Sequence, residues 1–356
     1  MIDNKIYKVI GLMSGTSLDG IDLAYCHFKK NKKKWSFKLI AFKSIDYSSL
    51  WKQKLSNLFY YKDKLELVDK EYSIYISKEI NLFINENNLD VDYISSHGHT
   101  IFHQPKKGYT KQIGRGDIIA SETKKIVICN FREQDILLGG QGAPLVPFGD
   151  NLLFSEYDSC LNLGGFSNIS YKIKGKMYAY DICPFNIVFN DLAKKIGLDY
   201  DKDGENASKG NINKDLLLDL NKIKYYSLSP PKSLSLEWVN KEFNIIMNNY
   251  NISQYDFLRT CLEHFSFQIN YNLKKINASN CLLSGGGAFN KFFIQNLKLN
   301  PTVNFIIPEK EIILFKEAII FAFLGLQRVF FKINCLSTVT GASKDHSSGD
   351  IYFPNS

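Results

Sequence analysis

Apolar and polar residues along this chain predict the same series of elements twice. In the first half, apolar runs and helical spacing predict strands at 7–13, 21–28 and 35–42, helices within 48–88, a strand at 93–96, a helix at 117–124 and a strand at 126–130. In the second half, they predict strands at 160–163, 169–173 and 177–181, helices between 186 and 276, a strand at 281–283, a helix after Asn290, a strand at 303–306 and a helix at 314–331. In each half, three strands surround a Gly-rich polar turn.

This repetition favours a duplicated α/β fold with two lobes around a central cleft. We expect an N-terminal lobe at 1–130, completed by the C-terminal segment 333–356, and a C-terminal lobe at 131–332. Gly and Pro crowd at 139–144, which we interpret as the linker between the lobes. The alternative is that a similar element order arises in many α/β proteins without duplication.

The first polar turn has a composition suited to phosphate. It contains Ser14, Gly15, Thr16, Ser17, Asp19 and Gly20. Glycines let the backbone approach a bound group, while hydroxyls and free N–H groups donate to anionic oxygens. Asp19 and Asp22 offer carboxylates to a hard cation, directly or through water. The alternative is an ordinary hairpin in which these residues only satisfy the turn geometry.

Three further polar loops follow predicted strands. They are Gly164-Gly165, the segment 97–100 and the segment 284–287. Ligands of open α/β sheets bind beyond the carboxyl ends of the strands, so we expect the four loops to converge on one ligand. The chain has no P-loop motif, and Gly114-Arg115-Gly116 lacks the third glycine of a dinucleotide fingerprint.

Composition narrows the class of protein. The 356 residues carry a formal net charge of +8, and five lysines between 29 and 34 fit a solvated hairpin turn better than a nucleic-acid arm. The seven cysteines form no Cys-x-x-Cys pair, and we find no leader-like segment, which favours a reduced, cytoplasmic chain. No uninterrupted apolar run approaches the roughly 20 residues of a membrane span. We therefore expect no nucleic-acid and no membrane partner.

Several ordered blocks carry a resemblance to a known family. They are Gly11 to Gly20 (GLMSGTSLDG), Ser96-His97-Gly98, Asn130-Phe131-Arg132 with Asp135, Gly139 to Pro147, Asn162 to Gly165 with Asn168, Ser284 to Ala288 with Asn290, Glu317-Ala318 with Ala322, and Thr340-Gly341-Ala342. Together they resemble the anhydro-N-acetylmuramic acid kinases, members of the sugar kinase, Hsp70 and actin superfamily. The resemblance implies a duplicated actin-like (ribonuclease H-like) ATPase fold and, as a family expectation, a homodimer.

The implied reaction is hydrolytic opening of 1,6-anhydro-N-acetylmuramic acid coupled to phosphorylation at O6 by MgATP. One carboxylate must activate the water. The family block that contains this base falls on 181–186, so Asp181 is implied as the catalytic residue, while Ile182, Cys183 and Phe185 replace a threonine and two glycines of the family. From the residues alone, a helix cap at a strand end is the favoured interpretation of Asp181.

The resemblance also implies the binding residues. Those for ATP are Gly15, Thr16, Ser17, Leu18, Asp19, Gly20, Ile21, Asp22, Gly164, Gly165, Gly285, Gly286 and Gly287. Mg²⁺ is expected near Asp19, directly or through water. Thr100, Arg132 and Glu317 are implied as the residues that bind the amino sugar. Arg132 suits the lactyl carboxylate, because a guanidinium forms two parallel bonds with a carboxylate, and its alternative is a salt bridge with Glu133 or Asp135.

Three other functions stay open at this point. The substrate of a divergent kinase would be another anhydro sugar. A non-catalytic ATP-dependent switch protein would share the fold, since the superfamily includes chaperones and filament formers. A metal hydrolase would use His97, His99 and His103, because the first two are two residues apart on a strand and are expected on one face.

Overall fold

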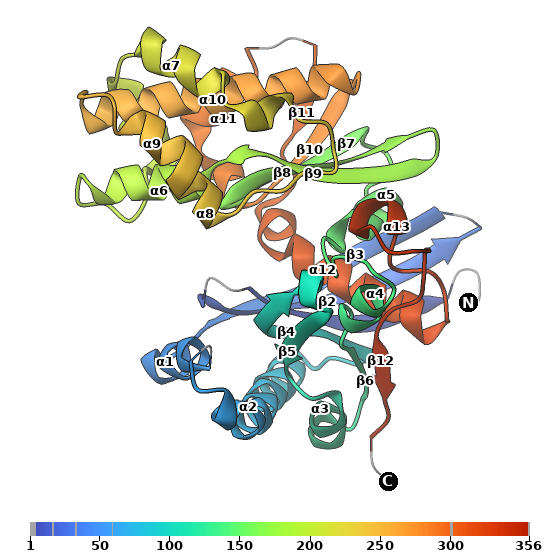
Figure 1. The fold of residues 1–356 in the computed structure, drawn as a ribbon. Coiled ribbons are helices and arrows are strands. Elements are labelled where there is room, and N and C mark those ends of the chain that lie inside the picture. The colour runs from blue at the N-terminus through green and yellow to red at the C-terminus, as the bar shows by residue number, and fades with distance from the viewer. Residues whose placement is uncertain (1–4, 16–17, 33, 59, 300–301, 355–356) are drawn as a thin grey trace. The chain divides into compact units, whose positions relative to one another are not determined.

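The computed structural model describes residues 5–15, 18–32, 34–58, 60–299 and 302–354 (Figure 1). The chain forms two compact units, of which the first contains 1–154 and 315–356 and the second contains 155–314. Each unit has its own sheet and its own hydrophobic core. No helix among the described residues is long and apolar enough to cross a membrane.

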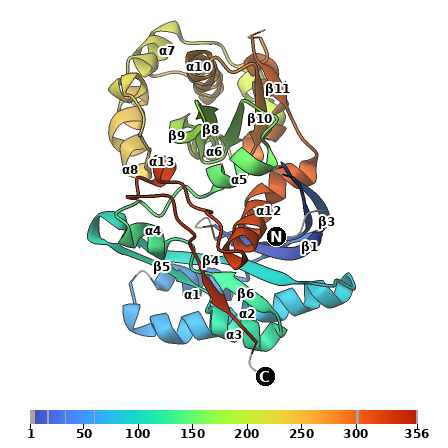
Figure 2. The ribbon, with the colours of Figure 1, turned by 90° about the vertical axis from the view of Figure 1, so that its right-hand side faces the viewer.

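Among the described residues, the sheet of the first unit has seven strands. They are β1 (Ile6–Ser14), β2 (Gly20–Asn31), β3 (Lys34–Asp46), β4 (Tyr93–Gln104), β5 (Tyr109–Ile113), β6 (Ile126–Cys129) and β12 (Asp350–Tyr352). Their order is β12-β6-β4-β1-β2-β3, and β5 pairs with β4. The strands β1, β2 and β3 are antiparallel, whereas β4 is parallel to both β1 and β6. Figure 2 shows β12 beside β6 near the C-terminus.

Helices cover both faces of this sheet. They are α1 (Ser49–Asn57), α2 (Leu65–Glu86), α3 (Gly116–Thr123), α4 (Glu133–Leu137), α5 (Val146–Leu153), α12 (Lys310–Val329) and α13 (Ser337–Thr340), with short 3₁₀ turns at Lys62–Lys64 and Pro105–Lys107. On one face, Tyr72 of α2 packs in a core with Leu12. On the other, Phe323 of α12 packs against Phe28. Gly11 permits this approach, because a Cβ there would overlap the carbonyl oxygen of Ala318.

In the second unit, the described residues form a sheet of five strands, in the order β11-β10-β7-β8-β9. They are β7 (Ser159–Leu163), β8 (Phe166–Ile173), β9 (Lys176–Pro184), β10 (Asn280–Ser284) and β11 (Asn304–Ile306). The helices are α6 (Asn186–Lys194), α7 (Lys214–Asn221), α8 (Leu236–Trp238), α9 (Asn244–Met247), α10 (Gln254–Lys275) and α11 (Lys291–Leu297). A π-helical turn at Val239–Phe243 and 3₁₀ turns at Lys202–Gly204, Ala207–Lys209, Lys224–Ser227 and Gly286–Phe289 complete the unit.

The strand orders confirm the predicted duplication. In the first unit β3-β2-β1-β4-β6 are neighbours, and in the second β9-β8-β7-β10-β11 follow the same order. In both, the first three strands are antiparallel, and two later strands extend the sheet in parallel. This is the duplicated actin-like ATPase fold that the resemblance implied.

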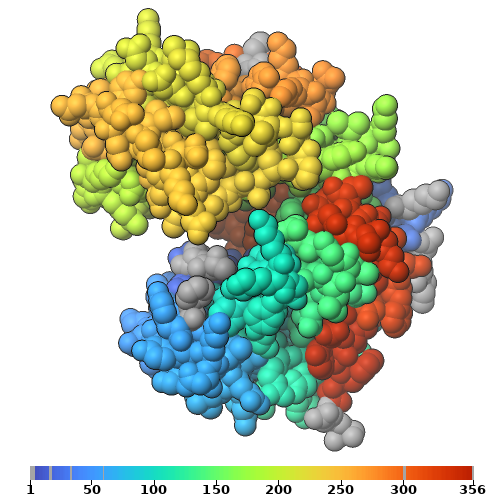
Figure 3. Space-filling model, in the orientation of Figure 1, coloured from blue at the N-terminus to red at the C-terminus, as the bar shows by residue number. Residues whose placement is uncertain are grey.

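The bounds of the units differ from the expected lobes at 1–130 with 333–356 and at 131–332. The chain passes between units at 154/155 and 314/315, so the segment 139–144 lies within the first unit and is not the linker. Polar and apolar contacts hold α4, α5 and most of α12 in the first unit. Asp135 accepts a hydrogen bond from the Thr340 hydroxyl, and Phe148 stacks on Phe323. Figure 3 shows the red C-terminal segment against the green surface of residues near 131–150.

Candidate active site

At the start of the first polar turn, Ser14 belongs to a buried network of hydrogen bonds. The Ser14 hydroxyl lies 2.8 Å from His99 Nδ1 and 2.7 Å from the Tyr47 hydroxyl, which in turn lies 2.8 Å from the Tyr72 hydroxyl. Burial lowers the pKa of His99 to about 4, so the ring is neutral at physiological pH. Thr16 and Ser17, both predicted ATP-binding residues, lie outside the described residues.

The end of the turn carries the two acidic residues predicted to bind a cation. Asp19 is exposed, whereas Asp22 on β2 is half-buried and accepts a hydrogen bond of 2.5 Å from the Ser44 hydroxyl. Burial, and then the charges of Asp19 and Asp46, raise the pKa of Asp22, while Ser44 lowers it. A bound cation would relieve this repulsion.

Three more residues of the stretch 14–22, namely Leu18, Gly20 and Ile21, have positions that packing in the first unit determines. A Cβ at Gly20 would overlap the carbonyl oxygen of Ile45 on β3. Leu18 has a left-handed backbone and is partly buried against the core. Ile21 is 1% exposed within that core, so only its backbone is available to a ligand.

The two Gly-rich turns of the second unit lie side by side. They follow β7 and β10, which are parallel neighbours with Asn162 opposite Ser284. Gly285 has a φ of 79°, and a Cβ there would lie 2.5 Å from Asn162 Oδ1, so glycine is required. A Cβ at Gly165 would have no atom of the described residues within 4 Å, which leaves room for a ligand beside this exposed glycine.

Asp181 lies on β9 and does not cap a helix, so the helix-cap interpretation is wrong. The next helix, α6, starts at Asn186 and has Phe185 at its N-cap. Asp181 Oδ2 accepts a hydrogen bond of 2.8 Å from the backbone N–H of Leu234, and its backbone oxygen accepts one of 2.6 Å from the Tyr225 hydroxyl. Burial raises the pKa of this half-buried carboxyl group, and the Leu234 N–H opposes the rise. A carboxylate of raised pKa is a better proton acceptor near neutral pH.

The residues that depart from the family block belong to the core. Ile182, Cys183 and Phe185 are each 0% exposed. The ring of Phe185 packs against Phe189, Phe265 and Phe293, and it occupies the space beside Gly287 that a Cβ would need. The backbone N–H of Phe185 donates to the carbonyl of Gly165 at 2.9 Å, which ties the end of β9 to the Gly-rich turn. The side chains of Ile182, Cys183 and Phe185 therefore pack in the core, and the position of Asp181 on β9 is kept.

Arg132 is held by a buried histidine and a backbone carbonyl. Its Nε and Nη2 lie 3.0 and 2.8 Å from His97 Nε2, and Nη1 donates to the carbonyl of Gly142 at 2.6 Å. His97 Nδ1 lies 2.9 Å from the carbonyl of Gly98, to which it donates, so Nε2 is the acceptor for the guanidinium. Burial, and then the charge of Arg132, hold the pKa of His97 well below its usual range, which keeps this tautomer neutral.

The two alternative partners of Arg132 have other hydrogen bonds. Glu133 accepts from the Asn130 amide, and Asp135 accepts from the Thr340 hydroxyl and the Gly142 N–H. The alternative for Arg132, a salt bridge with Glu133 or Asp135, is therefore not formed among the described residues. A guanidinium has five N–H groups, of which three are used in these contacts, and the remaining two are one on each terminal nitrogen. Burial lowers the pKa of Arg132 to about 10, which leaves it charged at neutral pH.

The other two predicted substrate residues lie on β4 and α12 of the same unit. The half-buried Thr100 accepts a hydrogen bond of 3.3 Å from the Gln112 amide of β5. Glu317 is accessible to solvent, yet the surrounding protein raises its pKa, and the positive charges of Arg132 and Lys316 oppose that rise. Lys316 itself forms a buried ion pair with Asp150 at 2.8 Å. This ion pair joins α12 to α5 next to Glu317.

The proposed metal site of His97, His99 and His103 is wrong. Gly98 has a φ of 71°, which interrupts the alternation of β4. His97 therefore packs against Phe321 of α12, and His99 packs against Tyr72 of α2, on opposite faces of the sheet. His103 is exposed. Within the described part of the chain, the one group of three residues able to hold a metal is Asp135, Cys335 and His346.

Each unit thus carries a separate part of the predicted site. The first unit has the turn at 14–22 together with Thr100, Arg132 and Glu317, while the second has Asp181 and both Gly-rich turns. The sequence analysis missed His97 as the partner of Arg132 and His99 as the partner of Ser14. Both histidines follow the strand predicted at 93–96, and this position at a strand end is the sequence feature that could have placed them in the site.

Comparisons with known proteins identify the family. The family model described as anhydro-N-acetylmuramic acid kinase matches residues 7–354. A curated anhydro-N-acetylmuramic acid kinase of Clostridioides difficile is 32% identical, with 96% of this chain and 97% of that protein aligned. One of Francisella tularensis subsp. novicida is 33% identical, over 97% of this chain and 98% of that protein. A solved structure of (R)-2-hydroxyglutaryl-CoA dehydratase component A from Acidaminococcus fermentans aligns with 89% of this chain and 96% of that chain, at 9% identity and a TM-score of 0.45. The chain belongs to the anhydro-N-acetylmuramic acid kinase family, and is therefore an ATP-dependent sugar kinase.

Proposed function

We propose that this enzyme opens 1,6-anhydro-N-acetylmuramic acid with water and phosphorylates it at O6, forming N-acetylmuramic acid 6-phosphate and ADP. The observation that carries the proposal is the family match over residues 7–354, together with relatives of that name aligned over nearly their whole length. The reaction would serve the recycling of cell-wall fragments and the catabolism of amino sugars.

Asp181 is the proposed general base. The Leu234 N–H anchors Oδ2, which leaves Oδ1 for a water molecule. As the water oxygen bonds to the anomeric carbon, its proton passes to the carboxylate, and the bond from that carbon to the bridging oxygen breaks. The released O6 then bonds to the γ-phosphorus of ATP, and ADP leaves. The proton is returned to solvent from Asp181, so the reaction consumes one water and one ATP.

Arg132 is the proposed partner of the lactyl carboxylate. Its two remaining N–H groups, one on each terminal nitrogen, suit a bidentate bond with a planar carboxylate. His97 and Gly142 fix the guanidinium beforehand, so little side-chain entropy is lost when the sugar binds. Thr100 and Glu317 complete the proposed sugar contacts, since hydroxyl and carboxylate oxygens suit sugar hydroxyls.

The Gly-rich turns are the proposed ATP site. Residues 15–22 would bind the triphosphate, Gly164 and Gly165 would supply a second turn, and 285–287 would lie near the adenosine. The donor set at Asp19 and Asp22 fits Mg²⁺, because burial, and then the charges of Asp19 and Asp46, raise the pKa of Asp22, and a cation there would favour the charged carboxylate. When bound, the ion would neutralise charge on the phosphate oxygens.

Release of ADP with three sugars tests this proposal. We expect turnover with 1,6-anhydro-N-acetylmuramic acid, and none with N-acetylmuramic acid, whose O6 is already free. The third sugar, 1,6-anhydro-N-acetylglucosamine, lacks the lactyl carboxylate and should react with a KM raised at least tenfold. Equal turnover of both anhydro sugars would indicate a kinase of another anhydro sugar. ATP binding without turnover of any of them would indicate a switch protein.

A further inference from the structure

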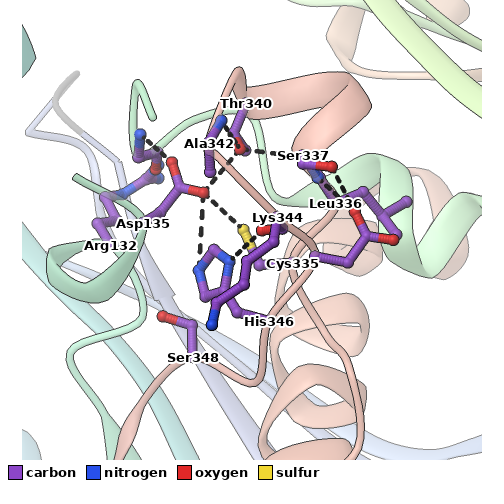
Figure 4. A network of polar contacts seen from close by, with 12 residues as sticks. Arg132, Asp135, Cys335, Leu336, Ser337, Thr340, Ala342, Lys344, His346 and Ser348 are labelled. Carbon is purple, nitrogen blue, oxygen red and sulfur yellow. Dashed lines mark hydrogen bonds and ion pairs between the residues drawn. The ribbon is translucent and has the colours of Figure 1, made fainter. Parts of the chain in front are cut away.

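A buried cluster outside the proposed active site joins two segments of the first unit. Asp135 comes from α4, while Cys335 and His346 come from the C-terminal segment, where their backbones form an antiparallel bridge. The N–H of each donates to the carbonyl of the other, at 3.1 and 3.2 Å. This pairing places the two side chains next to each other, and both point toward Asp135 (Figure 4).

The three side chains meet at one carboxylate oxygen. Cys335 Sγ donates to Asp135 Oδ1 at 3.1 Å, and His346 Nε2 lies 3.6 Å from the same oxygen. All three donor atoms lie within 4.8 Å of one another. The residues are 0%, 1% and 6% exposed for Asp135, Cys335 and His346 respectively. Sulfur, nitrogen and oxygen donors are thus gathered in one place that water hardly reaches.

The orientation of His346 is the second observation. Its Nδ1 lies 3.1 Å from the carbonyl of Lys344, so Nδ1 carries the proton and donates it. Nε2 faces the carboxylate of Asp135 at 3.6 Å, and within the described part of the chain it has no hydrogen-bond partner. In the interior, this nitrogen and the carboxylate oxygen are favourable neighbours only when a proton or a metal cation lies between them. A backbone carbonyl that fixes the second ring nitrogen is also the usual arrangement around a metal-binding histidine.

We propose that Asp135, Cys335 and His346 bind a divalent transition metal, with Zn²⁺ the best fit. Zinc accepts thiolate, imidazole and carboxylate ligands at about 2.0–2.3 Å, so its tetrahedral ligands lie about 3.3–3.7 Å apart. The separations of 3.1 and 3.6 Å from Asp135 Oδ1 require only small adjustments. Binding replaces the thiol proton of Cys335, which passes to solvent, by the metal. Mg²⁺ is not expected here, because it avoids thiolate ligands.

The location assigns the metal a structural role. Asp135 Oδ2 accepts from the Gly142 N–H at 2.7 Å, and the carbonyl of Gly142 accepts from Arg132 at 2.6 Å. A metal on Asp135 would therefore link the C-terminal segment to the loop that fixes Arg132. It would not take part in the reaction, and the inference does not depend on the proposed function.

Metal titration of the full-length, tag-free protein tests the proposal. After chelation under a phosphine reductant, Co²⁺ should bind at about one equivalent per chain and produce a thiolate-to-cobalt charge-transfer band. Zn²⁺ should displace it and raise the unfolding temperature, whereas Mg²⁺ should do neither. Cys335→Ser should abolish the band, and His346→Gln should weaken binding at least tenfold. Cys261→Ala removes a buried thiol of the second unit and should leave the band unchanged.

Circular dichroism establishes that each variant is folded before its titration is interpreted. If Cys335→Ser does not fold, the Co²⁺ affinity of His346→Gln alone tests the proposal, because that variant keeps the Cys335 thiol. Absence of the charge-transfer band in the wild type, or unchanged Co²⁺ affinity in a folded His346→Gln protein, would overturn the proposal. The cluster would then be a hydrogen-bond network that contains no metal.

Discussion

Arg132 and His97 are joined by two hydrogen bonds that end on one atom: Nε and Nη2 of the arginine lie 3.0 and 2.8 Å from Nε2 of the histidine. This arrangement requires a neutral imidazole with its proton on Nδ1, where the carbonyl of Gly98 accepts it. His97 is therefore a positioning residue for the guanidinium proposed to bind the lactyl carboxylate.

Replacement of His97 should impair sugar binding more than phosphoryl transfer. His97→Leu removes the acceptor for two donors of a charged group, a loss of about 1.5–3 kcal/mol, so KM for 1,6-anhydro-N-acetylmuramic acid should rise about 10- to 100-fold while kcat changes little. Steady-state kinetics check this. His97→Gln, which offers an amide oxygen, should recover part of the loss.

The matched control for this series is His27→Leu. His27 lies on β2 of the same unit and contacts the Tyr25 hydroxyl instead of Arg132, so its KM should stay at the wild-type value. With 1,6-anhydro-N-acetylglucosamine, which has no carboxylate for Arg132, His97→Leu should act like the wild type. An equal loss with both sugars would contradict the positioning role.

Replacement of Phe185 should destabilise the folded protein. Its buried ring touches three other aromatic residues, so Phe185→Ala should lower the free energy of unfolding by about 3–5 kcal/mol. Urea denaturation measures this cost. Phe267→Ala, on the 51% exposed phenylalanine of α10, should change stability by less than about 0.5 kcal/mol. A small effect of Phe185→Ala would mean that this departure from the family block has another role.

The buried His264 should make the second unit sensitive to acid. Burial lowers its pKa to about 3, so the folded state binds fewer protons than the unfolded state between about pH 3 and 6.5. Stability is therefore fully present above the unfolded pKa and is lost as the pH falls. At pH 5 the loss is about 2 kcal/mol relative to pH 7. Urea denaturation at both pH values should show a smaller pH dependence in His264→Gln, and an unchanged dependence would rule out His264 as the source.

The sequence predicted the repeated framework because its signals are local. Apolar alternation in 7–13 and 21–28, with a Gly-rich turn between them, reports a hairpin without any tertiary information. The same pattern at 160–173 then predicts the second unit. Strand ends were less accurate: β4 continues to Gln104 instead of ending at Ser96, because its last residues are polar and pair with β5.

The errors come from features that pattern alone does not contain. The positive φ of Gly98 turns His97 and His99 to opposite faces, and such a backbone angle has no periodic signal. The segment 139–144 resembles a linker by composition, yet Asp135 fixes it through Gly142 and Thr340. The cluster of Asp135 with Cys335 and His346 joins residues about two hundred positions apart, so it became visible only in the folded chain.

The most direct measurement of the central claim is kcat for Asp181→Asn with ATP and 1,6-anhydro-N-acetylmuramic acid. Loss of the water-activating carboxylate should lower kcat about 10²- to 10⁴-fold, while ATP affinity and unfolding temperature stay near the wild-type values. Asp191→Asn, on an exposed aspartate of α6 that pairs with Lys195, serves as the matched control and should keep full activity. A folded Asp181→Asn enzyme with kcat within about threefold of the wild type would show that Asp181 is not the base.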